Sequence, residues 1–248
     1  MDVSFQLYSS RSAASQSDVL RMLAQLGYTQ VEGFGGVYGD VSAFADAMAG
    51  AGVTMPSGHF GVADLENDFD ACIATANALG MRHIVAPYLE AQDRPTDAQG
   101  YIAFANRLSA ILPKVADQGF TFSWHNHDFE FAALPDGSIP MDIILQESPD
   151  LKWEADLAWI IRGGADPVDW LGKFGDRMIA VHVKDIAPAG EKQDEDGWAD
   201  VGHGVVDWGD LVTRSRAVAP DALMVMEHDK PSDVTRFATN SIAAFKAF

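Results

Sequence analysis

The chain has 248 residues, 48% of them hydrophobic, and a formal net charge of -19 from 36 acidic and 17 basic side chains. That charge repels polyanions and the sequence has no basic patch, so we expect no nucleic-acid partner. Because Cys72 is the only cysteine, the chain can form neither an internal disulfide nor a cysteine-based zinc cluster. We see no leader segment and no run of about 18 consecutive apolar residues, so we expect a cytoplasmic protein with no membrane contact.

Short β-rich segments alternate with longer segments in which apolar residues recur at helical spacing. This alternation is typical of a parallel sheet with crossover helices. The predicted strands cover residues 3–8, 30–34, 54–59, 83–88, 120–127, 151–159, 178–185 and 222–228. The predicted helices cover residues 15–26, 41–49, 68–79, 98–116, 141–146, 167–174, 208–218 and 234–245.

The number of strands selects the fold within the α/β class. Eight parallel strands close a barrel, whereas a doubly wound open sheet usually has fewer strands and a glycine-rich phosphate turn after the first. Here the first strand is followed by Ser9, Ser10 and Arg11, with no such turn. The sequence therefore predicts a single (β/α)8 TIM barrel domain over residues 1–248, and a homo-oligomer of it stays open.

One acidic, glycine-rich segment interrupts the alternation. Residues 187–204 separate the seventh strand from its helix and are longer than an ordinary connection. They are predicted to form an active-site loop or lid, and a disordered acidic insertion is the alternative.

Polar side chains collect at the carboxyl ends of the predicted strands, where (β/α)8 barrels hold their active sites. Five of the seven histidines lie there. Because side chains alternate along a strand, His125 and His127 share one face, and so do His182 and Lys184. Glu154 and Asp156 form a third such pair. The sequence therefore predicts a divalent-metal site rather than isolated core histidines.

These residues lie in motifs that resemble the xylose-isomerase-like TIM-barrel superfamily, especially its inosose-dehydratase-like branch. The motifs are residues 6–9 (QLYS), 27–32 (GYTQVE), His59, 124–131 (WHNHDFEF), 154–159 (EADLAW), 181–185 (VHVKD), 201–208 (VGHGVVDW) and 226–229 (MEHD). The resemblance implies a divalent-metal-dependent sugar isomerase or epimerase with a small carbohydrate substrate.

The resemblance also implies the metal ligands. The family ligands on strands six, seven and eight correspond to Asp156, His182 and Glu227, and His125 stands where many members have a strand-five glutamate. Such a mixed nitrogen and carboxylate set suits Mn, Co, Zn or Fe better than Ca, and Mg also stays open. His125 departs from the family pattern, as do Trp159 and His203, so the reaction is open between isomerisation and lyase chemistry.

Both reactions begin with removal of a proton α to a carbonyl, for which a bound metal would polarise the substrate. Glu227 is the candidate base as well as a ligand. His127 is a second acid/base, and Lys184 is an electrophile or acid. The candidate substrate-binding residues are Glu32, His59, Glu130 and Trp159.

Each of these roles has an alternative. Glu32 could form an ion pair across the barrel floor, His59 could orient a metal ligand, and Lys184 could be a counter-ion of Asp156 or Glu154. Trp159 and Trp124 could be barrel packing. A repair endonuclease shares the fold but needs a basic DNA surface, and a metal-free sugar-binding barrel is the non-enzyme alternative.

Overall fold

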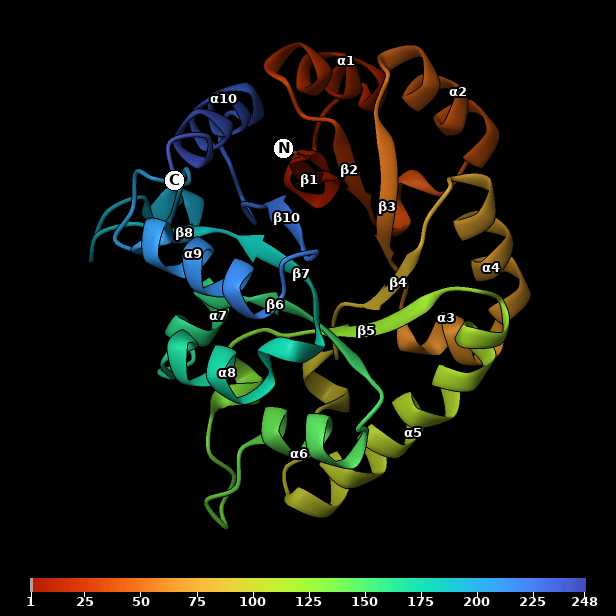
Figure 1. Cartoon of the computed structure of the whole chain (residues 1–248), viewed down its shortest axis with the longest axis vertical. Coiled ribbons are helices and arrows are strands. Elements are labelled where there is room, and N and C mark those ends of the chain that lie inside the picture. Colours follow the sequence, from red (N-terminus) through yellow and green to blue (C-terminus); the bar gives the residue numbers. More distant parts are fainter. Residues whose placement is uncertain (1) are drawn as a thin grey trace.

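Eight parallel strands close into one barrel in the computed structural model, which describes residues 2–248 (Figure 1). Met1, which the predicted domain includes, lies outside the described residues. Around the barrel the strand order is β1-β10-β7-β6-β5-β4-β3-β2. The strands are β1 (Ser4–Gln6), β2 (Gln30–Gly33), β3 (Thr54–His59), β4 (His83–Ala86), β5 (Thr121–His125), β6 (Lys152–Asp156), β7 (Met178–Val183) and β10 (Leu223–Met226). The predicted (β/α)8 TIM barrel is confirmed.

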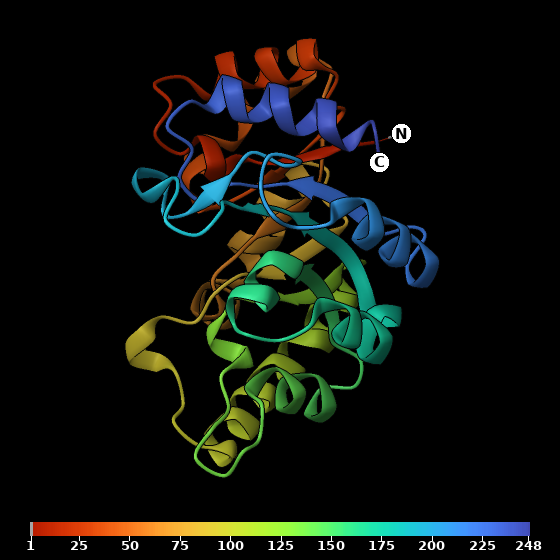
Figure 2. The same cartoon turned by 90° about the vertical axis from the view of Figure 1, so that its left-hand side faces the viewer.

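Helices surround this barrel and cover the outer faces of its strands (Figure 1). In Figure 2, α1 and α10 lie side by side, so the first and last helices complete the ring. The helices are α1 (Gln16–Leu26), α2 (Val41–Ala51), α3 (Val62–Asn67), α4 (Phe69–Ala78), α5 (Ala98–Asp117), α6 (Pro140–Glu147), α7 (Leu157–Arg162), α8 (Pro167–Phe174), α9 (Trp208–Val218) and α10 (Val234–Phe245). Within residues 2–248, no helix is both long enough and apolar enough to span a membrane.

The helix boundaries follow local signals in the sequence. Ser15 begins α1 by accepting a hydrogen bond from the Asp18 backbone N–H at 3.2 Å. Gly27 ends the same helix at φ 98°, a backbone conformation that residues with a Cβ rarely adopt. Asp40 and Gly52 begin and end α2 in the same way.

Three element predictions need correction. The predicted strand 151–159 ends at Asp156, because its side chain accepts a hydrogen bond from the Trp159 backbone N–H at 2.9 Å and begins α7. Trp159 therefore lies in a helix. The predicted strand 120–127 ends at His125, which places His127 in the following loop. Helix α3 was not predicted at all, because its six residues are too few to show a helical period.

The barrel interior is polar on the side where the strands end. On β7, Val181 and Val183 belong to the apolar core, whereas His182 points inward and reaches Glu32 on β2. The two strands are not neighbours in the sheet, so this contact crosses the barrel. The alternation within one strand thus separates the helix-facing core from a buried polar centre.

Candidate metal centre and active-site cavity

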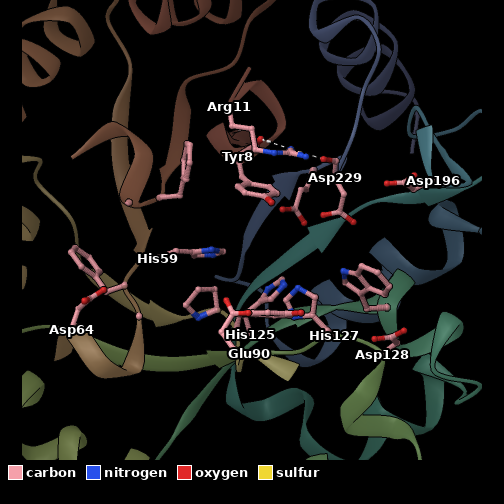
Figure 3. A pocket seen from close by; sticks show the side chains of 18 of the residues that line it. Tyr8, Arg11, His59, Asp64, Glu90, His125, His127, Asp128, Asp196 and Asp229 are labelled. Atoms are coloured by element: carbon pink, nitrogen blue, oxygen red, sulfur yellow. Dashed lines mark hydrogen bonds between the residues drawn. The ribbon is translucent and has the colours of Figure 1, made fainter. Parts of the chain in front are cut away.

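An open cavity of about 690 Å³ lies at the carboxyl ends of the strands (Figure 3). Its lining comes from segments that follow many different strands, which is where (β/α)8 barrels place their active sites. Figure 3 shows His59, His125 and His127 on one side, and Tyr8, Arg11 and Asp229 on the opposite side. The cavity is large enough for a sugar-sized molecule.

Four side chains converge at the floor of this cavity. Their ligand-type atoms all lie within 4.8 Å of one another, and all four residues are buried. We call this group the upper site; it consists of His125 on β5, Asp156 on β6, His182 on β7 and Glu227 after β10. These are the residues that the family resemblance selects.

The donor set of the upper site fits a divalent metal. It combines two imidazoles with two carboxylates, a mixture that suits first-row transition metals. His182 Nδ1 lies 2.8 Å from Glu227 Oε2. Asp156 Oδ2 is buried and accepts no hydrogen bond within the described chain, and its nearest cation is the Lys184 ammonium at 3.2 Å. Metal coordination would satisfy that oxygen.

Lys184 lies beside the upper site as a buried cation. Its Nζ is 3.2 Å from Asp156 Oδ2, 2.9 Å from Glu227 Oε2 and 2.9 Å from Asp229 Oδ2. Burial lowers the pKa of Lys184, but these three carboxylates outweigh it and hold that pKa well above the usual value. Lys184 is therefore a permanently charged, fully buried ammonium. This agrees with the interpretation of Lys184 as a counter-ion of Asp156, whereas Glu154 is not among its ion-pair partners.

The same charges set the protonation of the carboxylates. Burial raises the pKa of Asp156 to about 6, although Lys184 opposes this shift. Burial also raises the pKa of Glu227, but Lys184 and His182 hold it well below its usual range. Glu227 is therefore ionised and binds a proton weakly.

A second group lies deeper, toward the centre of the barrel. The ligand-type atoms of His59, His125, Glu154 and His182 are also all within 4.8 Å of one another. We call this the deep group. Three imidazole nitrogens surround Glu154 Oε1: His59 Nε2 at 2.8 Å, His125 Nδ1 at 3.1 Å and His182 Nε2 at 3.1 Å.

Glu32 borders the deep group on β2. Its Oε1 lies 2.7 Å from His182 Nε2 and 3.2 Å from His59 Nε2. Gln6 Nε2 donates to the same oxygen at 2.8 Å, and Ser57 Oγ donates to Oε2 at 2.5 Å. Glu32 is fully buried and does not line the cavity, so the structure does not bring it to a substrate hydroxyl. Its contacts are those of an ion pair across the barrel floor.

His127 is a cavity residue with a free proton acceptor. Its ring packs edge-on against Tyr88 at 4.8 Å, and its Nδ1 has no hydrogen-bond partner within the described part of the chain. Burial and the nearby Lys184 charge lower the pKa of His127 to about 3, so its imidazole is neutral at pH 7. It lies outside the upper site, and its low pKa makes it, like Glu227, a weak proton acceptor.

The remaining predicted residues divide between cavity and core. His59 and Trp159 line the cavity, so both are in place to touch a substrate. Glu130 is buried away from it and accepts hydrogen bonds from Trp124 Nε1 at 3.0 Å and the His127 backbone N–H at 2.9 Å. Glu130 therefore fixes the loop that carries His127, and Trp124 is packed in the core, as the packing interpretation expected.

Residues 187–204 take a defined conformation and are not a disordered insertion in this structure. They follow β8 (Asp185–Ile186) and include β9 (Trp198–Ala199), with which β8 forms a two-stranded antiparallel ribbon. The Asp185 carboxylate accepts hydrogen bonds from four backbone N–H groups, including those of Gly202 at 2.9 Å and Gly204 at 3.0 Å. A Cβ at Gly204 would overlap this carboxylate, which explains the glycine there.

The same loop is held against α10. Arg236 donates to Glu195 at 2.8 Å and to Asp200 at 3.0 Å, and Glu195 also accepts from the Ser232 backbone N–H at 2.6 Å. The loop contributes Trp198 and Asp196 to the cavity wall. It is thus an ordered loop that is held in place and forms part of the cavity wall.

Three arginines in the cavity wall were missed from the sequence. Arg11, Arg94 and Arg162 stack on aromatic rings, at 4.0 Å from the Tyr8 ring, 3.6 Å from the Phe129 ring and 3.3 Å from the Trp198 ring. Their hydrogen bonds go to backbone carbonyls and to one tyrosine hydroxyl. Within residues 2–248, no carboxylate lies within ion-pair distance of any of the three. Arg11 and Arg94 lie in connecting segments and Arg162 is the last residue of the short helix α7, so no regular sequence pattern marks them.

Comparison with known proteins decides the family. A family model described as a xylose isomerase-like TIM barrel matches residues 20–243. The chain belongs to this family. Xylose isomerase-like folds of known structure include a sugar phosphate isomerase/epimerase from Parabacteroides distasonis, at TM-score 0.82 and 18% identity over 99% of this chain and 93% of that one.

Two further xylose isomerase-like structures are similar in fold. The probable 3-DHS dehydratase from Bacillus anthracis has TM-score 0.78 and 16% identity, over 99% of both chains. The IolI protein with a zinc atom has TM-score 0.79 and 12% identity, over 100% of this chain and 97% of that one. No curated protein sequence matches the chain. At these identities the likeness concerns the fold.

Proposed function

We propose that this protein is a divalent-metal-dependent isomerase or epimerase of a small keto sugar or sugar phosphate, acting by proton abstraction α to a carbonyl. The observation that carries the proposal is the convergence of the upper site at the floor of an open, sugar-sized cavity. His125, Asp156, His182 and Glu227 would hold the ion. Bound there, a divalent metal supplies Lewis acidity that polarises a carbonyl and favours the enediolate.

The proton-transfer step falls to the side chains around the cavity. We assign the proton transfer to His127 on geometry, because it lines the cavity outside the upper site and presents an unprotonated imidazole with an unpartnered nitrogen. Glu227 remains a ligand and a second candidate base, although its low pKa favours the ligand role. Lys184 keeps the carboxylates ionised and so prepares them to bind a cation.

Substrate binding would rest on the cavity wall. Trp159 offers an apolar ring face against a sugar. Arg11, Arg94 and Arg162 are free of carboxylate partners among the described residues, and guanidinium groups bind phosphate well. These arginines support a sugar phosphate within the proposed substrate range. The net charge of -19 argues against a DNA substrate.

A lyase or dehydratase acting on keto sugars, inososes or 3-keto-glycosides is the second candidate. The observation that favours it is His125, which occupies the strand-five position where sugar epimerases of this family carry an acid/base glutamate. A lyase shares the first proton abstraction and then expels a hydroxyl or glycosyl group. The two reactions differ in product, because elimination creates a double bond and isomerisation does not.

The test is turnover of keto sugars, their phosphates, inososes and 3-keto-glycosides in D2O with added Mn, followed by proton NMR. We expect metal-dependent deuterium incorporation at the carbon next to the carbonyl. His127→Asn should slow this exchange by about 10² to 10⁴ and keep the metal content of the wild type. Glu227→Gln should lower metal affinity, because one anionic ligand becomes a neutral amide.

Three results would count against the proposal. Equal exchange rates in wild type and His127→Asn would remove His127 from the reaction, and loss of metal in that variant would move His127 into the metal site. A protein that binds no metal and shows no Mn-dependent thermal shift would favour a non-catalytic sugar-binding barrel.

A further inference from the structure

The deep group has the geometry of a metal site in its own right. Its four ligand-type atoms are one carboxylate oxygen and three imidazole nitrogens, with the nitrogens 2.8 to 3.1 Å from that oxygen. In a tetrahedral site with bonds of about 2.0–2.1 Å, neighbouring ligand atoms lie about 3.3 Å apart. Only His59 Nε2 is hydrogen-bonded to this oxygen, whereas His182 Nε2 is hydrogen-bonded to Glu32, so hydrogen bonding to Glu154 does not account for the approach of all three nitrogens.

Two buried atoms of the deep group that lack hydrogen-bond partners also support a bound ion there. His125 Nδ1 and Glu154 Oε2 are buried and lack hydrogen-bond partners anywhere in residues 2–248. His125 Nδ1 lies 3.1 Å from Glu154 Oε1 but without hydrogen-bond geometry. Buried polar atoms are rarely left unsatisfied, and an ion between these side chains would satisfy the nitrogen. His59 and His125 line the cavity, so an ion has a route from solvent.

His182 connects the deep group to the upper site through opposite ring nitrogens. Its Nδ1 faces Glu227 in the upper site, whereas its Nε2 faces Glu154 and Glu32. A neutral imidazole has one proton and one free lone pair. An ion in the upper site therefore leaves Nε2–H to donate to Glu32, and an ion in the deep group leaves Nδ1–H to donate to Glu227. As long as His182 stays a neutral imidazole, the two positions require opposite tautomers and exclude each other.

We propose that the deep group of His59, His125, Glu154 and His182 is a second divalent-metal position, selective for zinc, which competes with the upper site for one ion per chain. Three imidazoles and one carboxylate suit Zn, whereas the carboxylate-richer upper site suits Mn. Zinc in the deep group holds His182 in the tautomer that the upper site cannot use. This goes beyond the proposed function, since it concerns which ion the barrel accepts and where.

The direct test is anomalous diffraction from crystals of the full chain soaked with ZnCl2 or with MnCl2. We expect the zinc peak between His59 and Glu154, and the manganese peak between Asp156 and Glu227. A zinc peak in the upper site alone overturns the proposal. So does simultaneous occupancy of both positions by zinc, because the tautomer argument forbids it.

Matched variants give the same test in solution. Asp156→Asn/Glu227→Gln removes ligands of the upper site only, and His59→Asn/Glu154→Gln removes ligands of the deep group only. We expect the first variant to retain one zinc per chain with three imidazoles by X-ray absorption. We expect the second to lose that three-imidazole signature and to bind zinc more than about 100-fold more weakly, since even loss of an orienting partner costs 10–100-fold.

Circular dichroism establishes that both variants are folded, and the wild-type crystals decide the question if either is not. A folded upper-site variant without zinc overturns the inference. The outcome is separable from the proposed function: deuterium exchange with Mn in a chain that holds no zinc in the deep group defeats this inference alone. Zinc in the deep group of a chain without any exchange defeats the proposed function alone.

Discussion

Lys184→Met tests whether the buried ammonium stabilises the folded protein by offsetting the repulsion between the carboxylates of the upper site. The substitution keeps an unbranched apolar stem, which can still pack near the Trp198 ring, 4.6 Å from the present Nζ. It removes the only lysine charge among Asp156, Glu227 and Asp229 in the described structure. The variant therefore separates the charge from the packing.

The expected loss is large because the group is fully buried. Removing one partner of a buried ion pair costs about 3–5 kcal/mol. For a chain of this length, 1 kcal/mol corresponds to about 2–4 °C in Tm, so we expect a fall of about 6–20 °C at pH 8 without metal. At pH 5 the fall should be smaller, because protons can then neutralise Asp156, whose pKa burial already raises to about 6.

Thermal unfolding with a chelator present is the assay, and Lys173→Met is the matched control. Lys173 pairs with Asp142 at the surface, and such pairs contribute about 0–1 kcal/mol. Added Mn should recover part of the Lys184→Met loss, since the ion restores positive charge beside the carboxylates. The reasoning is refuted if Lys184→Met destabilises no more than Lys173→Met at pH 8.

Three further outcomes follow from the structure. Mn at about 100 times its Kd should stabilise the wild type by about 2.7 kcal/mol, and Asp156→Asn should show a much smaller shift in the same melt. Arg236→Met should lower stability to urea by about 1–3 kcal/mol and expose residues 187–204 to protease, whereas the exposed Arg214→Met should do neither. Burial raises the pKa of Glu130 to about 8, so the folded state holds an extra proton above pH 4.5. Its contribution to stability should fall between pH 4.5 and 8, and Glu130→Gln should flatten that part of the urea-midpoint profile.

The fold was predictable because each β/α unit carries its own local signals. Alternating periods, helix caps such as Ser15 and stop glycines such as Gly27 are properties of adjacent residues. Strand ends were less predictable where one residue has two roles. Asp156 belongs to the upper site and also begins α7, so its helix-starting role was hidden by its place in a strand motif.

The convergence of the four proposed ligands could be predicted from the sequence and its family resemblance, whereas their surroundings could not. His125, Asp156, His182 and Glu227 fall at strand ends, and closing the barrel is enough to bring them together. Glu32 illustrates the limit: its position opposite His182 depends on a contact across the barrel between strands that are 150 residues apart. No local pattern encodes such a distance.

The charge of the barrel centre connects stability with metal binding. Glu32, Glu154, Asp156 and Glu227 are all buried, and Lys184 is the one lysine or arginine in contact with them in the described chain. The remaining positive charge that offsets these carboxylates must come from protons on histidines or from a metal ion. Burial lowers the pKa of His59, but Glu154 and Glu32 raise it to about 9, and Glu154 and Glu227 likewise raise the pKa of His182, so in the absence of metal these two histidines carry this charge. A divalent ion would displace those protons, so metal uptake should release protons and weaken as the pH falls. The excess of buried carboxylate is unfavourable for folding, and the same excess would favour binding of a cation.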